Sequence, residues 1–250
     1  VSSDRQIFSD MVGRKSELDR LELHILKAKN GDGSIVNVIG EAGIGKTRLI
    51  AELKERQSIN DVYILEGRAI SMGRNLSFYP IIEVIKGWAN IHEHDPEHVV
   101  RNKLESAIKA IYPEQADEII PFTSTMMGIK LHGKYAERVI GIEGEALEKL
   151  IQKNLRDLIL KASELTTIVF IMEDLHWADA SSIELLMSLF RLVNENRILF
   201  INIFRPYYKA TGEKLLRSIF DNFPDLHKAI YIQPLNRNHS DRLIDNLLKV

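Results

Sequence analysis

Short runs of consecutive apolar residues alternate along this chain with longer segments in which apolar residues recur every three or four positions. The short runs predict strands, and the periodic segments predict amphipathic helices. The predicted strands cover 35–39, 62–65, 168–172, 198–204 and 229–232, and the predicted helices cover 15–29, 46–57, 181–193, 211–222 and 239–248. Two capping-box pairs are expected to begin helices: Ser16 with Asp19, and Ser181 with Glu184. Short buried strands that alternate with helices are typical of an α/β fold whose parallel sheet is covered on both faces.

A mostly helical pattern fills residues 79–164, between the second and third predicted strands. Pro96, Pro113 and Pro121 are expected to break these helices, because proline cannot donate a backbone hydrogen bond. The glycine-containing stretch 128–144 is expected to form a loop. The sequence therefore predicts a helical insertion in the α/β domain.

Composition narrows the class of protein. The 250 residues are 45% hydrophobic, enough for one large core or for a core with a small second unit. The net charge of −2 argues against binding to nucleic acid or to an anionic membrane by this segment. The longest apolar run, 168–172, is too short to cross a bilayer, no leader pattern opens the chain, and the lack of cysteine excludes a disulfide scaffold and thiol catalysis. We expect a cytoplasmic protein and, because the chain starts at Val1, a piece of a longer one.

The strongest chemical signal lies between the first predicted strand and the helix that follows it. Eight residues match the G-x-x-x-x-G-K-[ST] pattern of a phosphate-binding P-loop: Gly40, Glu41, Ala42, Gly43, Ile44, Gly45, Lys46 and Thr47. Its glycines let backbone N–H groups turn toward phosphate oxygens, and the helix points its positive end at the same anion. Lys46 is expected to reach the β- and γ-phosphates, and the Thr47 hydroxyl to hold Mg²⁺. The alternative is a glycine-rich turn that binds nothing, and the strand–loop–helix context argues against it.

Charged residues follow two of the buried strands. Glu173 and Asp174 come directly after strand 168–172, at the edge of the sheet where ligands of open α/β folds bind. We expect Glu173 to serve the metal and Asp174 to orient the attacking water, and the reverse assignment stays open. Arg205 follows strand 198–204 and is expected to contact the γ-phosphate, with a solvated strand-end arginine as the alternative.

Four segments together resemble the STAND branch of AAA-type P-loop ATPases. They are Met11-Val12-Gly13-Arg14, the loop 40–47, the stretch 169–179 that contains E-D-L-H-W-A-D, and Phe204-Arg205-Pro206. More narrowly, residues 10–240 are similar to the ATPase module of LuxR-type transcription activators and of class III (soluble-type) adenylyl cyclases. The P-loop is common to many NTPases, whereas its combination with the other segments is much more specific.

The resemblance implies roles for individual residues. Val12 would pack on the adenine base, and Gly13 and Arg14 would lie near the nucleotide. Glu173 and Asp174 would form the Walker B pair, which in this family is often Asp-Asp or Asp-Glu. Arg205 would be the sensor arginine. The catalytic residues would be Lys46, Glu173, Asp174 and Arg205. The nucleotide-binding residues also include Arg48, and the metal ligands would be Thr47, Glu173 and Asp174.

The resemblance also implies a domain organisation. Residues 1–235 would form a three-layer P-loop NTPase domain with a five-stranded parallel sheet in the order 5-1-4-3-2. Residues 236–250 would begin a helical lid that the chain does not complete.

The function that these features favour is an ATP-binding, slowly hydrolysing switch module of a cytoplasmic signalling or transcription regulator. Its ligands would be ATP or ADP with Mg²⁺. Its partners would be other domains of the same longer chain and, through nucleotide-dependent self-assembly, further copies, with no contact with nucleic acid or membrane. A catalytic P-loop enzyme, either a kinase or a fast ATPase with its own substrate, is the alternative.

Two weaker groupings complete the candidates. Arg68 and Arg74 flank a polar segment, and we expect an exposed loop there, with a position facing the phosphates or a partner subunit as the alternative. His92, His94 and His98 are close in sequence, but Pro96 interrupts the helix that would align them. A solvated loop is therefore favoured over a metal site.

Overall fold

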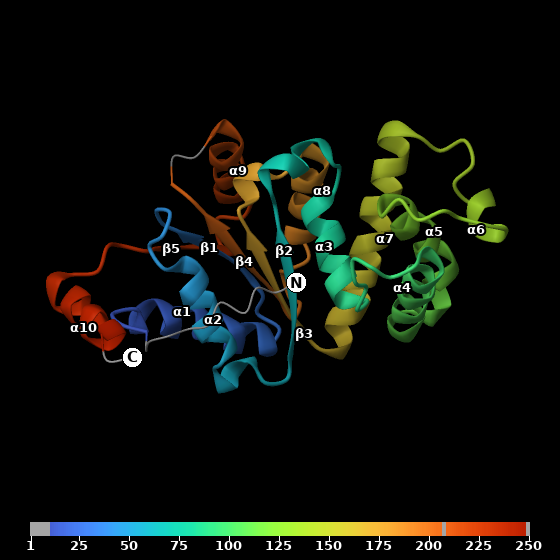
Figure 1. The fold of residues 1–250 in the computed structure, drawn as a ribbon. Helices are drawn as coiled ribbons and strands as arrows, with labels where there is room; N and C mark the ends of the chain where they lie inside the picture. The colour runs from blue at the N-terminus through green and yellow to red at the C-terminus, as the bar shows by residue number, and fades with distance from the viewer. Residues whose placement is uncertain (1–10, 207–208, 249–250) are drawn as a thin grey trace.

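A parallel five-stranded sheet forms the centre of the molecule (Figure 1). The computed structural model describes residues 11–206 and 209–248, without the side chains of 74, 75 and 209–212. The strands are β1 (Ser34–Ile39), β2 (Val62–Arg68), β3 (Thr167–Glu173), β4 (Ile198–Phe204) and β5 (His227–Tyr231). They pair in the order β2-β3-β4-β1-β5, and each pairing is parallel. The predicted order is therefore confirmed.

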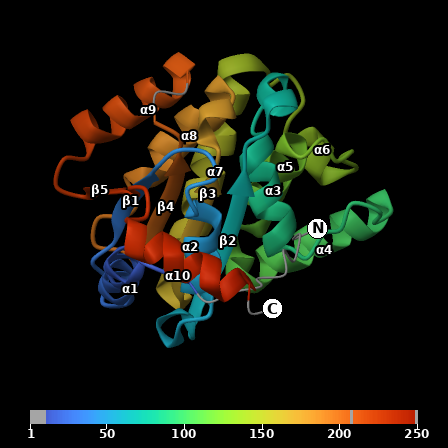
Figure 2. The same cartoon turned by 60° about the vertical axis from the view of Figure 1, so that its left-hand side comes forward.

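Helices cover both faces of this sheet, which confirms the three-layer α/β architecture of a P-loop NTPase (Figure 2). Their bounds are α1 (Lys15–Lys29), α2 (Lys46–Lys54), α3 (Tyr79–Trp88), α4 (Glu97–Ile111), α5 (Ala116–Met126), α6 (Lys134–Glu137), α7 (Gly144–Leu165), α8 (Ala180–Phe190), α9 (Lys209–Asn222) and α10 (Arg237–Leu248). Short 3₁₀ turns are η1 (Gln57–Ile59), η2 (Ser71–Asn75), η3 (Pro113–Gln115) and η4 (Leu175–Trp177). Within the described part of the chain, no helix is long and apolar enough to cross a membrane.

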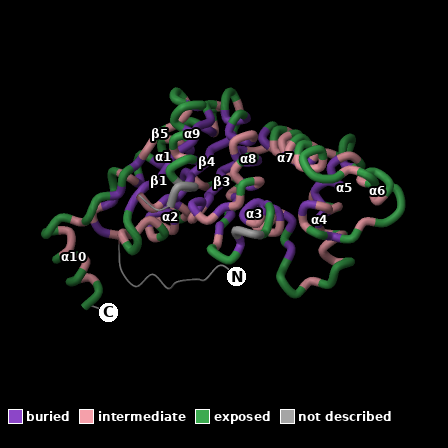
Figure 3. Tube along the Cα trace, turned by 90° about the horizontal axis from the view of Figure 1, so that it is seen from above, coloured by how far each residue is buried: buried purple, intermediate pink, exposed green. Residues whose placement is uncertain are grey.

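Alternate residues of the central strands pack into two separate cores, one on each face of the sheet. Leu199 and Ile201 of β4 pack with α1 and α2 on one face, whereas Phe200 packs with α8 and α9 on the other. All seven residues of β4 are buried, and the ring of Phe200 stacks on Phe170 of β3 at 4.5 Å between centroids. Buried residues accordingly concentrate along the sheet, while α10 has none (Figure 3). This buried sheet fixes the positions of the strand ends that carry the candidate site.

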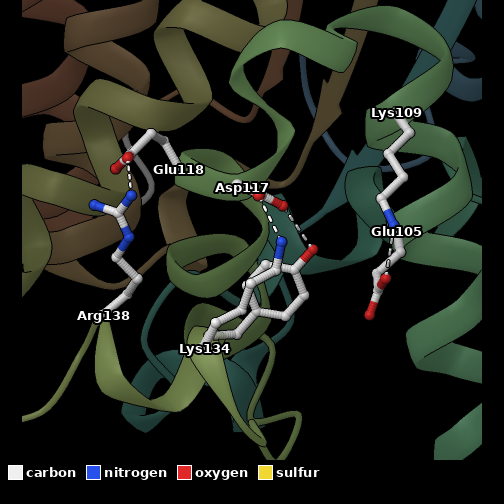
Figure 4. Close-up of polar contacts among 7 residues, drawn as sticks. Glu105, Lys109, Asp117, Glu118, Lys134 and Arg138 are labelled. Carbon is white, nitrogen blue, oxygen red and sulfur yellow. Dashed lines mark hydrogen bonds and ion pairs between the residues drawn. The ribbon is translucent and has the colours of Figure 1, made fainter.

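The segment between β2 and β3 forms helices α3 to α7, of which α4, α5 and α6 extend away from the sheet (Figure 1). Residues near α6 are tied to α5 by polar contacts: Lys134 and Tyr135 both reach Asp117, and Arg138 pairs with Glu118 (Figure 4). These contacts hold the loop that precedes α7 against the helices of the insertion.

Several predicted details of the helices are wrong. Pro121 does not break a helix but lies inside α5, where most residues around it are buried, so tertiary packing outweighs the lost hydrogen bond. Neither capping box forms, because each serine falls within its helix rather than before it. No side chain caps α1, and Asp179 caps α8 by accepting from the N–H of Ser182. The hydroxyl of Ser181 donates instead to Glu148 of α7 at 2.8 Å.

Candidate functional site

The P-loop joins the carboxyl end of β1 to the first turn of α2, as the motif requires. Gly43 and Gly45 have φ angles of 75° and 102°, which other residues adopt only with strain. Glu41, Ala42, Gly43 and Thr47 are exposed, and Ile44, Gly45, Lys46 and Arg48 are partly exposed. The loop therefore offers its surface to solvent between a buried strand and a helix N-terminus, the arrangement that suits an anion.

The ammonium group of Lys46 folds back onto its own loop. Its Nζ donates to the carbonyl oxygens of Gly40 at 2.7 Å and of Glu41 at 2.8 Å. Burial, and then the positive charge of Arg205, lower the pKa of Lys46, while Asp174 opposes that shift. Lys46 therefore belongs to the same electrostatic cluster as Asp174 and Arg205.

The two carboxylates at the end of β3 lie at the same edge of the sheet: Glu173 is the last residue of the strand, not the first after it as predicted, and Asp174 follows it. Asp174 adopts a left-handed backbone with φ 55°, and its Oδ1 lies 3.8 Å from Nε of Arg205, which follows β4. Glu173 is half-buried, and burial raises the pKa of its carboxyl, with Arg68 acting in the opposite direction. The sheet thus brings Lys46, Asp174 and Arg205 together at one edge, while Glu173 lies among the charges of Arg68, Glu66 and Lys54.

Arg68 is a site residue whose position the sequence did not predict. It does not lie in a loop but ends β2, in register with Glu173 of β3. Its guanidinium donates to Oδ2 of Asp174 from Nη2 at 3.1 Å and from Nε at 3.3 Å. The side chain of Arg74 lies outside the described part of the structure. The strand continues through Glu66 and Gly67, where exposed and buried residues alternate, and these two residue types give no apolar run by which the sequence could have extended β2 to Arg68.

Residues 11–14 contact both the P-loop and the last helix. Val12 is buried, and the buried guanidinium of Arg14 pairs with Glu17 and donates to the carbonyl of Ile44 at 3.3 Å. Gly13 has φ 68°, and a Cβ built on it would lie 2.5 Å from Nδ1 of His239 in α10. The segment 11–14 therefore lies between the P-loop and α10.

The other predicted residues are placed as follows. Thr47 is in the first turn of α2 with an exposed side chain, and Nη2 of Arg48 pairs with Glu52 one turn later at 3.2 Å. His176 is fully buried beside Trp177, which packs against the core. Residues 91–96 form the predicted loop, which holds His92 and His94 and in which Asp95 pairs with Lys103 at 2.7 Å, whereas His98 lies in the first turn of α4.

The donor set fits Mg²⁺. Thr47, Glu173 and Asp174 supply a hydroxyl and two carboxylates, and Mg²⁺ in nucleotide sites is held by few protein oxygens together with phosphates and water. Among the described residues no group of three or more His, Cys, Asp or Glu side chains could hold a metal ion. That finding does not conflict with a site that needs phosphate oxygens to complete it.

Comparison with known proteins gives three findings. An uncharacterized protein of Rhizobium meliloti is 23% identical over 211 residues, which are 80% of this chain and 19% of the relative, so the chain spans about a fifth of the relative's length. The structure of the Aeropyrum pernix ORC1 protein in complex with DNA aligns over 96% of this chain and 50% of that chain, with a TM-score of 0.44 and 15% identity. A family model described as the AAA ATPase domain matches residues 10–201, well over half of the sequence, and the chain therefore belongs to the AAA ATPase domain family.

Proposed function

We propose that this segment is the ATP-dependent switch of a longer regulatory protein, in which hydrolysis is slow and the nucleotide state is passed to other domains. Membership of the AAA ATPase domain family indicates nucleotide binding and ATPase activity. The switch, the slow turnover and the regulatory role go beyond that and form the proposal.

One observation carries this proposal: the P-loop and the last helix are joined through residues 11–14. Arg14 donates to the carbonyl of Ile44 in the loop, and Gly13 lies against His239 of α10. A nucleotide that shifts the loop would therefore change the packing of α10. Helix α10 has no buried residue, so it can respond without disruption of the main cores. We assign residues 1–235 to the nucleotide-binding domain and 236–250 to the start of a helical lid.

The residues at the strand ends would divide the work in this site. Lys46 would leave the carbonyls of Gly40 and Glu41 and bind phosphate oxygens, and Arg205 would contact the γ-phosphate. Thr47 with Glu173 or Asp174 would hold Mg²⁺, which would neutralise phosphate charge when bound. Useful coupling needs the γ-phosphate to bias the lid by on the order of 1–3 kcal/mol. A few charge-assisted hydrogen bonds can supply that bias.

The proposed regulatory role is supported by the length of a relative and by the resemblance to ATPase modules of multidomain regulators. The chain spans 19% of its Rhizobium relative, so a protein of that kind has room for several other domains. Coupling to such domains, self-assembly that depends on ATP, and a cytoplasmic location are parts of the proposal.

The test compares ATP and ADP binding by the wild-type chain and by Lys46→Ala, using calorimetry with Mg²⁺ present. We expect the variant to lose nucleotide binding. Lys149→Ala, which removes an exposed lysine paired with Glu145 on α7, is the matched control and should bind like wild type. Unchanged affinity of Lys46→Ala would contradict the assignment of the site. Steady turnover well above about 1 s⁻¹ would instead favour a catalytic enzyme over a switch.

A further inference from the structure

We propose that Arg68 competes with Mg²⁺ for the carboxylate of Asp174, and so sets the Mg²⁺ concentration at which this site binds nucleotide. Arg68 is then a positioning residue that acts through Asp174. This inference rests on the proposed function, since it concerns the same site.

The geometry places Asp174 between two arginines from neighbouring strands. In the sheet, β3 lies between β2 and β4, and Arg68 and Arg205 stand at the ends of these two flanking strands. Arg68 donates to Oδ2 of Asp174 from two nitrogens, at 3.1 and 3.3 Å. Arg205 faces the other oxygen, Oδ1, at 3.8 Å. Both carboxylate oxygens are therefore turned toward guanidinium groups.

A carboxylate that is paired with arginine is a weaker metal ligand than a carboxylate without such a partner. Mg²⁺ holds its oxygen ligands in a strict octahedral geometry, and a carboxylate takes part either by direct coordination or through a bound water. Two positive guanidinium groups beside Asp174 oppose the approach of a divalent cation by charge as well. Asp174 therefore becomes a better ligand for Mg²⁺ once one of the arginines has moved away.

Exposure indicates that Arg68 is the arginine that gives way. Its side chain is 63% exposed, against 35% for Arg205 and 17% for Asp174. An ion pair with such a solvated member is weak and is screened by salt. Arg68 stands on β2, an edge strand, and its released guanidinium can turn to solvent.

The experiment measures ATP binding by fluorescence of a labelled ATP analogue while Mg²⁺ is titrated, for wild type, Arg68→Ala and Arg68→Lys. We expect Arg68→Ala to lower the Mg²⁺ midpoint about two- to fivefold, because a surface ion pair is lost. Arg68→Lys should lie between them, since it keeps the charge but not the pair of donors on one oxygen. Arg68→Gln is the second neutral variant, should Arg68→Ala be poorly folded.

Two controls separate this role from a structural one. Arg138→Ala removes another half-exposed arginine paired with an acid, Glu118, in the helical insertion (Figure 4), and should leave the midpoint unchanged. In an Asp174→Asn background, Arg68→Ala should no longer shift the midpoint, since Arg68 acts through that carboxylate. A midpoint that is unchanged or raised in Arg68→Ala, with wild type binding normally, would overturn the inference alone. Wild-type protein that binds no nucleotide would instead overturn the proposed function.

Discussion

The contact between Gly13 and His239 gives the sharpest test of how α10 is coupled to the P-loop. An alanine at position 13 would have to adopt φ 68°, and its Cβ would lie 2.5 Å from Nδ1 of His239 and 3.0 Å from Cδ2 of Leu235. The left-handed backbone costs an alanine about 1 kcal/mol, and the overpacking adds about 1–3 kcal/mol. Since α10 has no buried residue, the strain is relieved most easily by release of α10.

Hydrogen exchange of the α10 amides measures this release directly. An opening that becomes easier by about 2–4 kcal/mol raises exchange about 30- to 700-fold, because each 1.4 kcal/mol corresponds to a factor of ten. Exchange in β4, which is buried throughout, should change far less.

A second substitution divides the strain into its two parts. His239→Ala removes the ring that a new Cβ at position 13 would strike, so the double variant Gly13→Ala/His239→Ala should keep only the backbone cost, about 1 kcal/mol or fivefold in exchange. Exchange of α10 at wild-type rates in Gly13→Ala, or equal rates in the single and double variants, would refute this contact. Faster release of ADP from Gly13→Ala would then link the same contact to nucleotide retention.

Two further predictions concern stability. Burial, followed by nearby lysine and arginine charges, lowers the pKa of His24 to about 4, and Nδ1 lies 2.8 Å from the hydroxyl of Ser34. The folded pKa is depressed, so the contribution of His24 is complete above pH 6.5 and is lost as pH falls from 6.5 toward 4. We expect this loss of folding free energy to be about 1–2 kcal/mol after allowance for solvent screening. Urea unfolding at several pH values measures it, with His24→Gln as the control. The stability of His24→Gln should fall less between pH 6.5 and 4. Asp179→Ala removes the acceptor for the N–H groups of Ser182 at 2.9 Å and Phe78 at 3.2 Å, so unfolding should become about 2–3 kcal/mol easier. Asp179→Asn, which keeps an acceptor oxygen, should lose less, and equal losses in both variants would argue against the cap.

The strands of the sheet are predictable from the sequence to the extent that they are apolar. Strands β3 and β4 are buried on both faces, so their runs of apolar residues mark them to within a residue or so at each end. The edge strand β2 alternates between exposed and buried positions, so its last three residues carry no continuous apolar signal. The order of the strands came from family resemblance, because hydrophobic patterns do not specify which strands become neighbours.

Helix ends and breaks depend on contacts that a local pattern does not contain. Ser181 matches a capping pattern, but Glu148 of α7 accepts its hydroxyl, and Asp179 caps the helix instead. Pro121 predicts a break, but it is buried within a helix that packs against α4 and α7. At Pro121 tertiary packing outweighs a preference of about 3 kcal/mol, and at α8 a neighbouring aspartate takes the place of the predicted serine cap.

In the candidate site, the sequence predicts where the charged side chains lie but not which of them pair with each other. A parallel sheet necessarily gathers the residues that follow its strands at one edge, so Lys46, Asp174 and Arg205 could be brought together from sequence alone. The choice of partner depends on the left-handed turn at Asp174, φ 55°, which aims the carboxylate between the two flanking strands. No residue type specifies that turn, and aspartate adopts it only at a modest cost. The pairing of Arg68 with Asp174 therefore follows from strand register and one backbone angle, and both become known only with the structure.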